Sequence, residues 1–169
     1  QDIHTITASK IYNIDPDNVS RNQRSNAKTV NFGIIYGVSA FGLSQQTELT
    51  RMESKVMIEN YFMNYPKLKN YMSQQIEFAR NQGYVQTMMG RRRYLPNMSS
   101  QNNMLRSSAE RNAINAPIQG TAADIIKIAM INIRNKFKNQ SLKSKMILQV
   151  HDELVFDVLK SEKDIVSRI

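Results

Sequence analysis

Apolar residues recur at helical spacing through most of this chain, and two short stretches have the composition of β-hairpins. Leu68, Met72, Ile76 and Ala79 show the helical spacing, because side chains three or four residues apart share one face of a helix. The pattern predicts an α+β fold that is mostly helical. The expected helices cover residues 3–13, 21–37, 39–46, 51–65, 66–82 and 104–138, and the expected hairpins cover 84–94 and 146–159.

Prolines, glycines and capping residues set the expected ends of these elements. The Asp-Pro-Asp sequence at 15–17 predicts a turn and a helix start, because a residue before proline avoids the α region. Thr50 and Glu53 have the spacing of a capping box at a helix N-terminus. Gly83 fits a helix stop, and Gly90 fits the tip of the first hairpin.

Two positions inside the expected helices need explanation. Gly33 costs a helix about 1 kcal/mol relative to alanine, so we expect either a close approach to the backbone or tight packing there. Pro117 removes one helical hydrogen bond and should bend the long helix. Beyond it, residues 122–137 are strongly periodic and are expected to form core.

The helix expected at residues 21–37 carries a stripe of two cations followed by two aromatic rings. Arg24, Lys28, Phe32 and Tyr36 follow one another at four-residue steps, so they wind slowly along one side over roughly 18 Å. That layout suits a ligand with an anionic head and a flat apolar tail, such as a nucleoside triphosphate. The same spacing also suits a surface helix with a basic first half and a core-facing second half.

Composition favours a polyanionic partner. The chain has 169 residues, a net charge of +9 and a pI near 9.9, which point most simply to nucleic acid, although a merely soluble basic protein would look the same. It has no cysteine, so disulfides and thiol metal sites are excluded. No apolar run approaches the roughly 20 residues of a membrane span, and the first residues lack the apolar region of a secretion signal.

The second hairpin has two carboxylates at its expected turn. His151, Asp152 and Glu153 lie between apolar residues, so a rigid hairpin would present the acids to solvent. Magnesium takes one or two protein carboxylates and completes its shell with water and phosphate oxygens. An ordinary polar turn has the same composition, so these three residues alone leave both interpretations open.

Two further groups suit contacts with nucleic acid. Arg111, Asn115 and Gln119 are again four residues apart, and long donors on one helix face can reach the minor-groove acceptors common to all base pairs. The run from Arg91 to Arg93 would suit phosphate contacts. Each group alone is equally typical of a solvated polar surface.

Several motifs, in order, resemble the family A DNA polymerases, the bacterial DNA polymerase I type. RSNAKTVNFGIIYG at 24–37 resembles their motif B, and QVHDELVFDV at 149–158 resembles their motif C. The segments DIHTITA, GYVQTMMGRRRYLP and ERNAINAPIQGTAADIIK are also similar to family segments in the same order. The resemblance covers essentially the whole chain.

The resemblance implies a right-hand polymerase fragment with fingers helices and part of an antiparallel palm sheet. Residues 1–98 would be mainly fingers with a hairpin, and residues 99–169 would be a palm segment with the long bent helix and the acidic hairpin. The family's motif A, with its second metal-binding aspartate, and the thumb and exonuclease regions are not in this sequence. We therefore expect a fragment cut at both ends that has little activity alone and needs the rest of its parent polymerase.

The resemblance also implies roles for individual residues. The dNTP would be bound by His4, Arg24, Lys28, Phe32 and Tyr36. Primer–template DNA would be bound by Gly37, Arg91, Arg92, Arg111, Asn115, Gln119 and His151. Lys28, Asp152 and Glu153 would take part in catalysis, with Asp152 as one of two aspartates that hold two Mg²⁺ ions.

Two other functions stay open from the sequence. A single-subunit RNA polymerase shares the palm-and-fingers plan, and a non-catalytic DNA-binding module could keep the scaffold. The residues NFGIIYG and HDE in the two motifs favour the DNA polymerase. Arg24, Lys28 and Asp152 argue against a module without catalysis. The chain is rich in asparagine, lysine and isoleucine, which suggests an AT-rich source, either a bacterium or an organelle such as a plastid or apicoplast, and no secretion.

Overall fold

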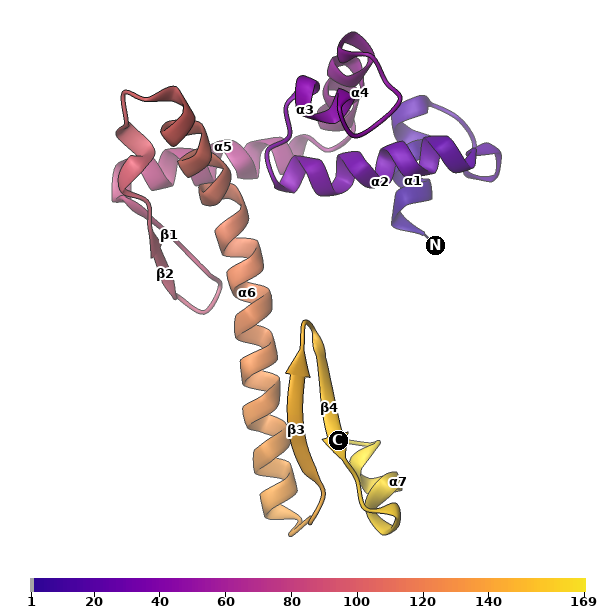
Figure 1. Cartoon of the computed structure of the whole chain (residues 1–169), viewed down its shortest axis with the longest axis vertical. Helices are drawn as coiled ribbons and strands as arrows, with labels where there is room; N and C mark the ends of the chain where they lie inside the picture. Colours follow the sequence, from indigo (N-terminus) through magenta and orange to yellow (C-terminus); the bar gives the residue numbers. More distant parts are fainter. Residues whose placement is uncertain (1) are drawn as a thin grey trace. The chain divides into compact units, whose positions relative to one another are not determined.

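A computed structural model describes residues 2–169, which divide into two compact units at residues 2–118 and 119–169 (Figure 1). The described residues are mostly helical with two small antiparallel sheets, so the predicted α+β class is confirmed. In the first unit, four helices precede the longer α5. They are α1 (Ile3–Tyr12), α2 (Arg21–Ile35), α3 (Ala40–Ser44) and α4 (Arg51–Asn64), with a 3-10 turn, η1 (Pro16–Asn18), after α1.

The ends of these helices follow the predicted local chemistry. Thr50 caps α4 and forms the expected reciprocal pair of hydrogen bonds with Glu53. α5 (Pro66–Gln82) begins with its proline in the first turn and ends at Gly83, whose φ of 74° is left-handed. The predicted helix at 39–46 is shorter, because α3 covers only residues 40–44.

The first unit has two apolar clusters that hold the site-bearing helices. One joins α1, α2, α3 and α4 through Ile11, Val30, Ile34, Leu43 and their neighbours Met57 and Tyr61. The other joins α5, the first hairpin and the first half of α6 through Ala79, Val85, Leu95, Met98, Ala109, Ala113 and Ala116. Val56, the residue before Met57 on α4, is 46% exposed.

The first hairpin pairs β1 (Tyr84–Gln86) with β2 (Arg92–Tyr94), and Gly90 in its loop has a φ of 81°. A 3-10 turn, η2 (Pro96–Ser99), leads to α6 (Asn103–Asn139), which continues through Pro117 as one helix. The bend that we predicted at Pro117 stays a prediction. The unit boundary falls within α6, directly after Ile118.

The second unit contains the rest of α6, the second hairpin and two short helical turns. β3 (Lys145–Val150) pairs with β4 (Glu153–Asp157), and η3 (Lys160–Glu162) and α7 (Lys163–Val166) follow. Glu162 accepts hydrogen bonds from the backbone N–H groups of Lys143 and Ser144, so it ties the start of β3 to η3.

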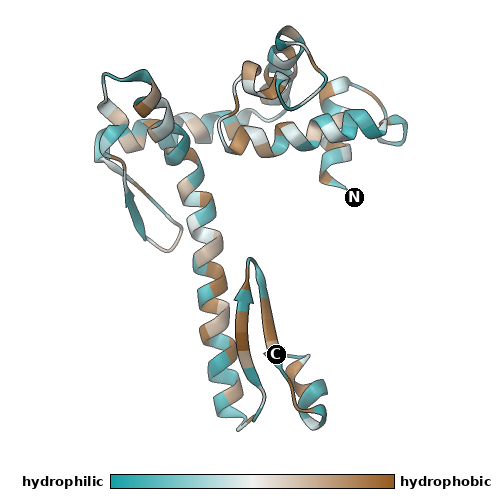
Figure 2. Ribbon diagram, viewed as in Figure 1, coloured by the Kyte–Doolittle hydropathy of each residue, from teal (hydrophilic) through white to brown (hydrophobic). Residues whose placement is uncertain are grey.

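The expectation that residues 122–137 form core is wrong for the described residues. Ile125, Ile128 and Ile131 are 55%, 40% and 59% exposed, whereas Phe137 is buried and its ring lies 5.9 Å from that of Phe156. Figure 2 shows apolar turns alternating with polar ones along this part of α6. The helical period is correct, but only Phe137 of this face packs on the hairpin as a buried ring, and the three isoleucines stay largely exposed among residues 2–169.

Candidate functional site

The helix α2 presents the predicted stripe because both of its ends are fixed locally. The Ser20 hydroxyl oxygen accepts from the backbone N–H of Gln23, and the Gln23 side-chain oxygen accepts from the backbone N–H of Ser20. These two hydrogen bonds form a capping box at the start of α2. The helix gives way to Tyr36 and then Gly37, whose φ is 69°. Because Ala27, Val30 and Ile34 on the opposite side are buried, the Lys28, Phe32 and Tyr36 side stays at the surface.

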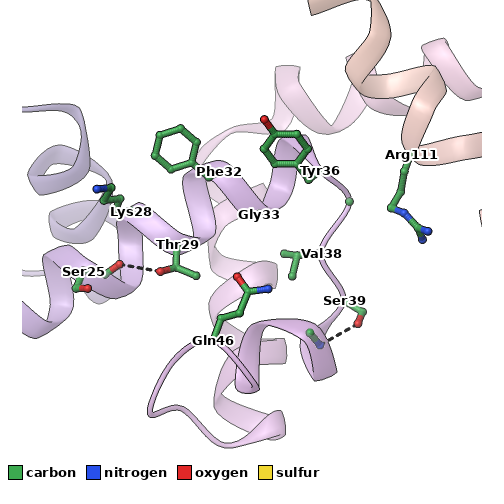
Figure 3. Close-up of a pocket in the computed structure, with 12 residues that line it drawn as sticks. Ser25, Lys28, Thr29, Phe32, Gly33, Tyr36, Val38, Ser39, Gln46 and Arg111 are labelled. Atoms are coloured by element: carbon green, nitrogen blue, oxygen red, sulfur yellow. Dashed lines mark hydrogen bonds between the residues drawn. The ribbon is translucent and has the colours of Figure 1, made fainter. Parts of the chain in front are cut away.

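Lys28, Phe32 and Tyr36 line one open groove of about 620 Å³ in the first unit (Figure 3). Phe32 and Tyr36 are each 51% exposed, although aromatic rings are usually more buried. The groove lies between α2 and α3, and Arg111 of α6 also lines it. Its other lining residues are Ser25, Thr29, Gly33, Gly37, Val38, Ser39, Gly42 and Gln46. An ammonium group beside two exposed rings fits an anionic and aromatic ligand.

Two glycines allow the groove to form. A Cβ on Gly33 would lie 2.7 Å from Cγ1 of Val38, so the predicted close approach to the helix backbone is confirmed. The backbone N–H of Val38 also donates to the carbonyl of Gly33 at 2.8 Å. A Cβ on Gly37 would lie 2.6 Å from Cγ of Arg111, so the end of α2 meets the Arg111 side chain directly. Gly37 and Arg111, both expected to contact DNA, therefore lie together.

The first turn of α1 brings His4 to the same side of α2. Its ring lies 5.8 Å from that of Phe32, centroid to centroid, and its Nδ1 lies 3.0 Å from the amide nitrogen of Asn31. Asn31 also bonds Thr7, a buried residue of α1. His4 and Phe32, both expected to bind the dNTP, therefore lie together.

Arg24, the other predicted triphosphate cation, is bound by a carboxylate. Its Nε lies 2.8 Å from Oδ2 of Asp2, and its Nη2 lies 3.1 Å from Oδ1. The Arg24 guanidinium, helped by Thr5, holds the pKa of Asp2 far below its usual range. Asp2 is therefore ionised at neutral pH, and Arg24 is not among the residues that line the groove.

The acidic hairpin lies in the second unit. His151 and Asp152 form its two-residue turn, and His151 adopts a left-handed φ of 53°. The predicted position of Glu153 within the turn is wrong, because Glu153 is the first residue of β4 and pairs with Val150. All three residues are exposed.

The acidic residues do not make a complete metal centre by themselves. Within residues 2–169 there is no group of three or more histidine, cysteine, aspartate or glutamate side chains that could hold a metal ion. Asp152 and Glu153 would supply at most two carboxylate ligands. Arg24 lies in the first unit and Asp152 in the second, so the expected dNTP-binding and metal-binding residues are divided between the two units.

The remaining predicted DNA contacts occupy a hairpin and α6. Arg92 stacks over the ring of Tyr84, with its Cζ 4.5 Å from the ring centroid, and Arg91 follows the loop at an exposed position. On α6, Oδ1 of Asn115 is buried and has no hydrogen-bond partner among the described residues. Gln119 follows on the same helix as the first residue of the second unit, and its place on the Asn115 face stays a prediction.

Sequence reasoning missed Asp2 and Asn31, which hold predicted site residues, and the lining residues Val38 and Gln46. Asp2 could have been found as a helix N-cap, since it precedes the first helical residue and accepts from the N–H of Thr5. Its pairing with Arg24 depends on how α1 packs on α2, which no local pattern specifies.

Residues 1–169 match the profile of DNA polymerase family A over their whole length. The chain belongs to this family. It is 52% identical over 162 residues to DNA polymerase I of Streptococcus pneumoniae, covering 95% of this chain and 18% of that protein. It is 47% identical over 168 residues to DNA polymerase I of Bacillus subtilis, covering 99% of this chain and 19% of that protein.

A solved structure is also similar. It is the POL domain of Pol1 from M. smegmatis in complex with DNA primer-template and dNTP, with a TM-score of 0.92 and 43% sequence identity. The match covers 99% of this chain and 30% of that one. The chain thus spans about a fifth of the length of its DNA polymerase I relatives.

Proposed function

We propose that this chain is the nucleotide-binding and primer–template-binding segment of a longer polymerase, here called the parent polymerase, that carries out template-directed DNA synthesis. The reaction transfers a nucleotide from dNTP to the 3′-hydroxyl of a primer. The observation that carries the proposal is the groove where Lys28, Phe32 and Tyr36 meet Gly37 and Arg111, in a chain that belongs to DNA polymerase family A. The relative from M. smegmatis, solved with DNA primer-template and dNTP, supports it.

The exposed side of α2 and the first turn of α1 would bind the incoming nucleotide. Arg24 and Lys28 supply positive charge for the triphosphate, and His4 lies beside Phe32 at the aromatic end. Phe32 packs against the sugar, and Tyr36 lies at the nascent base pair. Lys28 also donates a proton to the pyrophosphate leaving group, as a general acid.

The DNA would be held by residues at the end of α2, on α6 and in the two hairpins. Gly37 and Arg111 lie at the end of the groove, and Asn115 continues the same face of α6. In the second unit, Gln119 would contact the DNA from α6, and His151 would contact the end of the primer. Arg91 and Arg92 in the first hairpin would contact phosphates, where their charge acts without reading sequence.

Asp152 would be one ligand of a divalent metal, with Mg²⁺ as the proposed ion in a two-metal site. The residues fit this in part: Asp152 is exposed at a tight turn and Glu153 follows it, while Mg²⁺ uses one or two protein carboxylates and takes its other ligands from water and phosphates. An aspartate outside residues 1–169 would complete the site. When bound, the metal stabilises the negative charge that develops on the reacting oxygens.

An aspartate substitution in the parent polymerase tests this function. Asp152→Ala should lower kcat for primer extension by at least about a hundred-fold, because a metal ligand is lost. Asp157→Ala, in the same hairpin, is the matched control and should keep normal activity. Normal extension by the Asp152 variant would favour a non-catalytic DNA-binding module instead.

The substrate preference of the parent polymerase tests the remaining alternative. Faster extension with dNTP than with rNTP is expected, whereas the reverse would indicate a single-subunit RNA polymerase. The purified chain of 169 residues should show little or no extension by itself. Measurable extension by this chain would show that its own residues complete the metal site.

The compartment is proposed from the relatives. The DNA polymerase I relatives are bacterial, which favours the cytoplasm of a bacterium, with an organelle of an AT-rich organism as the alternative. Among residues 2–169, no helix is both long and apolar enough to cross a membrane.

A further inference from the structure

The Asp2 carboxylate accepts two hydrogen bonds from one edge of the Arg24 guanidinium. The two hydrogen bonds, at 2.8 Å from Nε to Oδ2 and 3.1 Å from Nη2 to Oδ1, are both needed to fix the plane of the group. The two side chains are 45% and 39% exposed, so the pair lies at the surface where a ligand can reach it.

Asp2 is itself held in place by the first turn of α1. Its Oδ2 accepts from the backbone N–H of Thr5 at 2.9 Å and from the Thr5 hydroxyl at 2.6 Å. α1 is in turn joined to α2 through the hydrogen bond between Asn31 and the buried Thr7. The carboxylate at the N-cap of α1 is therefore held in a fixed position beside α2.

The geometry leaves the opposite edge of the guanidinium available. Arginine donates through Nε and both Nη nitrogens, and Asp2 takes Nε and one hydrogen of Nη2. Nη1 and the second hydrogen of Nη2 then face away from the carboxylate. Two parallel N–H donors of this kind match two oxygens of a phosphate.

We propose that Asp2 is a positioning residue for nucleotide binding, which orients Arg24 so that its Nη1 edge meets the triphosphate of the incoming nucleotide. This inference rests on the proposed function. An arginine side chain that is already oriented loses less conformational freedom when the ligand binds. The negative charge of Asp2 opposes binding, but water and salt screen this repulsion at an exposed position.

Asp2→Ser in the parent polymerase separates positioning from helix capping. Serine is a good N-cap, so α1 keeps its first hydrogen bond, but its side chain is too short to hold two guanidinium nitrogens. We expect KM for dNTP to rise about two- to five-fold with kcat unchanged, the range of an exposed ion pair. Asp17→Ser, which removes the same charge from the exposed η1, is the matched control and should leave KM unchanged.

A double-mutant cycle shows whether Asp2 acts through Arg24. Arg24→Ala should raise KM by itself, and Asp2→Ser should add nothing in that background. A lowered or unchanged KM in Asp2→Ser, or effects that add in the double variant, would overturn the positioning role. Asp2→Asn keeps the helix cap and one oxygen acceptor for Arg24, so its KM for dNTP should lie between those of the wild type and Asp2→Ser. This variant replaces Asp2→Ser in the test if the serine variant does not fold. A wild-type parent polymerase that extends no primer would refute the proposed function itself.

Discussion

Gly37 combines a backbone constraint and a side-chain constraint at one residue. Its φ of 69° is a conformation that other residues adopt only with strain, and a Cβ there would lie 2.6 Å from Cγ of Arg111. Gly83 has a similar φ of 74° but nothing within 4 Å of its Cβ position. The two glycines therefore differ only in what surrounds them.

Gly37→Ala should destabilise the parent polymerase more than Gly83→Ala does. Both changes carry the cost of a left-handed alanine, about 1 kcal/mol, and Gly37→Ala adds about 1–3 kcal/mol because Arg111 must move. Urea unfolding measures the difference. Arg111→Ala should remove the extra cost in the Gly37→Ala background, and equal losses for the two glycines would contradict the contact.

At the residue scale, the sequence predicts what one helix arranges by itself. The i+4 steps of Lys28, Phe32 and Tyr36 put them along one groove, as expected, because helix geometry alone determines their spacing. Asp2 and Arg24 are far apart in the chain, and their contact depends on the packing of two helices. Such pairings follow from tertiary structure, so a local pattern does not reveal them.

At the element scale, α2 and α4 offer two matched capping boxes. Ser20 with Gln23 begins α2, and Thr50 with Glu53 begins α4, and both pairs show the reciprocal hydrogen bonds. Because α2 carries the groove side chains and α4 supports it only through the core, the same loss of a cap should affect function differently in the two helices.

Ser20→Ala and Thr50→Ala should each destabilise the protein by about 1 kcal/mol. Only Ser20→Ala should also raise KM for dNTP, because fraying of the first turn of α2 loosens Arg24. Urea unfolding and steady-state extension by the parent polymerase measure the two effects. If both variants changed KM equally, the cap of α2 would have no special role in nucleotide binding.

Glu162 links β3 and η3 through a carboxylate whose ionisation depends on its partners. The backbone N–H of Lys143 and the N–H and hydroxyl of Ser144 lower the pKa of Glu162 below its ordinary value of 4.5. Because the folded pKa is lowered, this carboxylate stabilises the fold above the ordinary pKa, and the contribution disappears as pH falls through the folded pKa.

Glu162→Gln should therefore destabilise the second unit most at neutral pH. The difference from the wild type should shrink as pH falls below the ordinary value of 4.5 and through the lowered pKa of Glu162 in the folded state, where the wild-type carboxylate also becomes protonated. The NMR signal of the Ser144 amide, followed through urea unfolding at several pH values, measures this unit directly. A difference that does not change with pH would mean that the charge of Glu162 contributes nothing.

At the scale of the whole molecule, the sequence predicted the order and type of the elements more fully than their burial. Caps, prolines and glycines are local signals, and they placed α4 and α5 close to their observed bounds. Burial depends on what covers each face, so the periodic isoleucines of α6 were expected in a core and are exposed. The groove combines α2, α3 and Arg111 of α6, and that combination required the folded unit.

The isoleucines of α6 give a prediction that compares the chain with its parent polymerase. An exposed apolar face on one helix is typical of a surface that another segment covers, and here the family relatives are about five times longer than this chain. Ile125→Lys and Ile131→Lys should thus reduce self-association of the isolated chain. In the parent polymerase the same changes should lower the free energy of unfolding by about 2 kcal/mol or more each.

Met52→Lys and Met63→Lys are the matched controls, because these methionines of α4 are 70% and 71% exposed. Because exposed methionines lose little on replacement by lysine, both changes should leave the free energy of unfolding of the parent polymerase nearly unchanged. Sedimentation of the isolated chain and urea unfolding of the parent polymerase provide the two measurements. Equal tolerance of lysine at the isoleucine and methionine positions in the parent polymerase would show that the α6 face remains exposed there, and its helical period would then need another explanation.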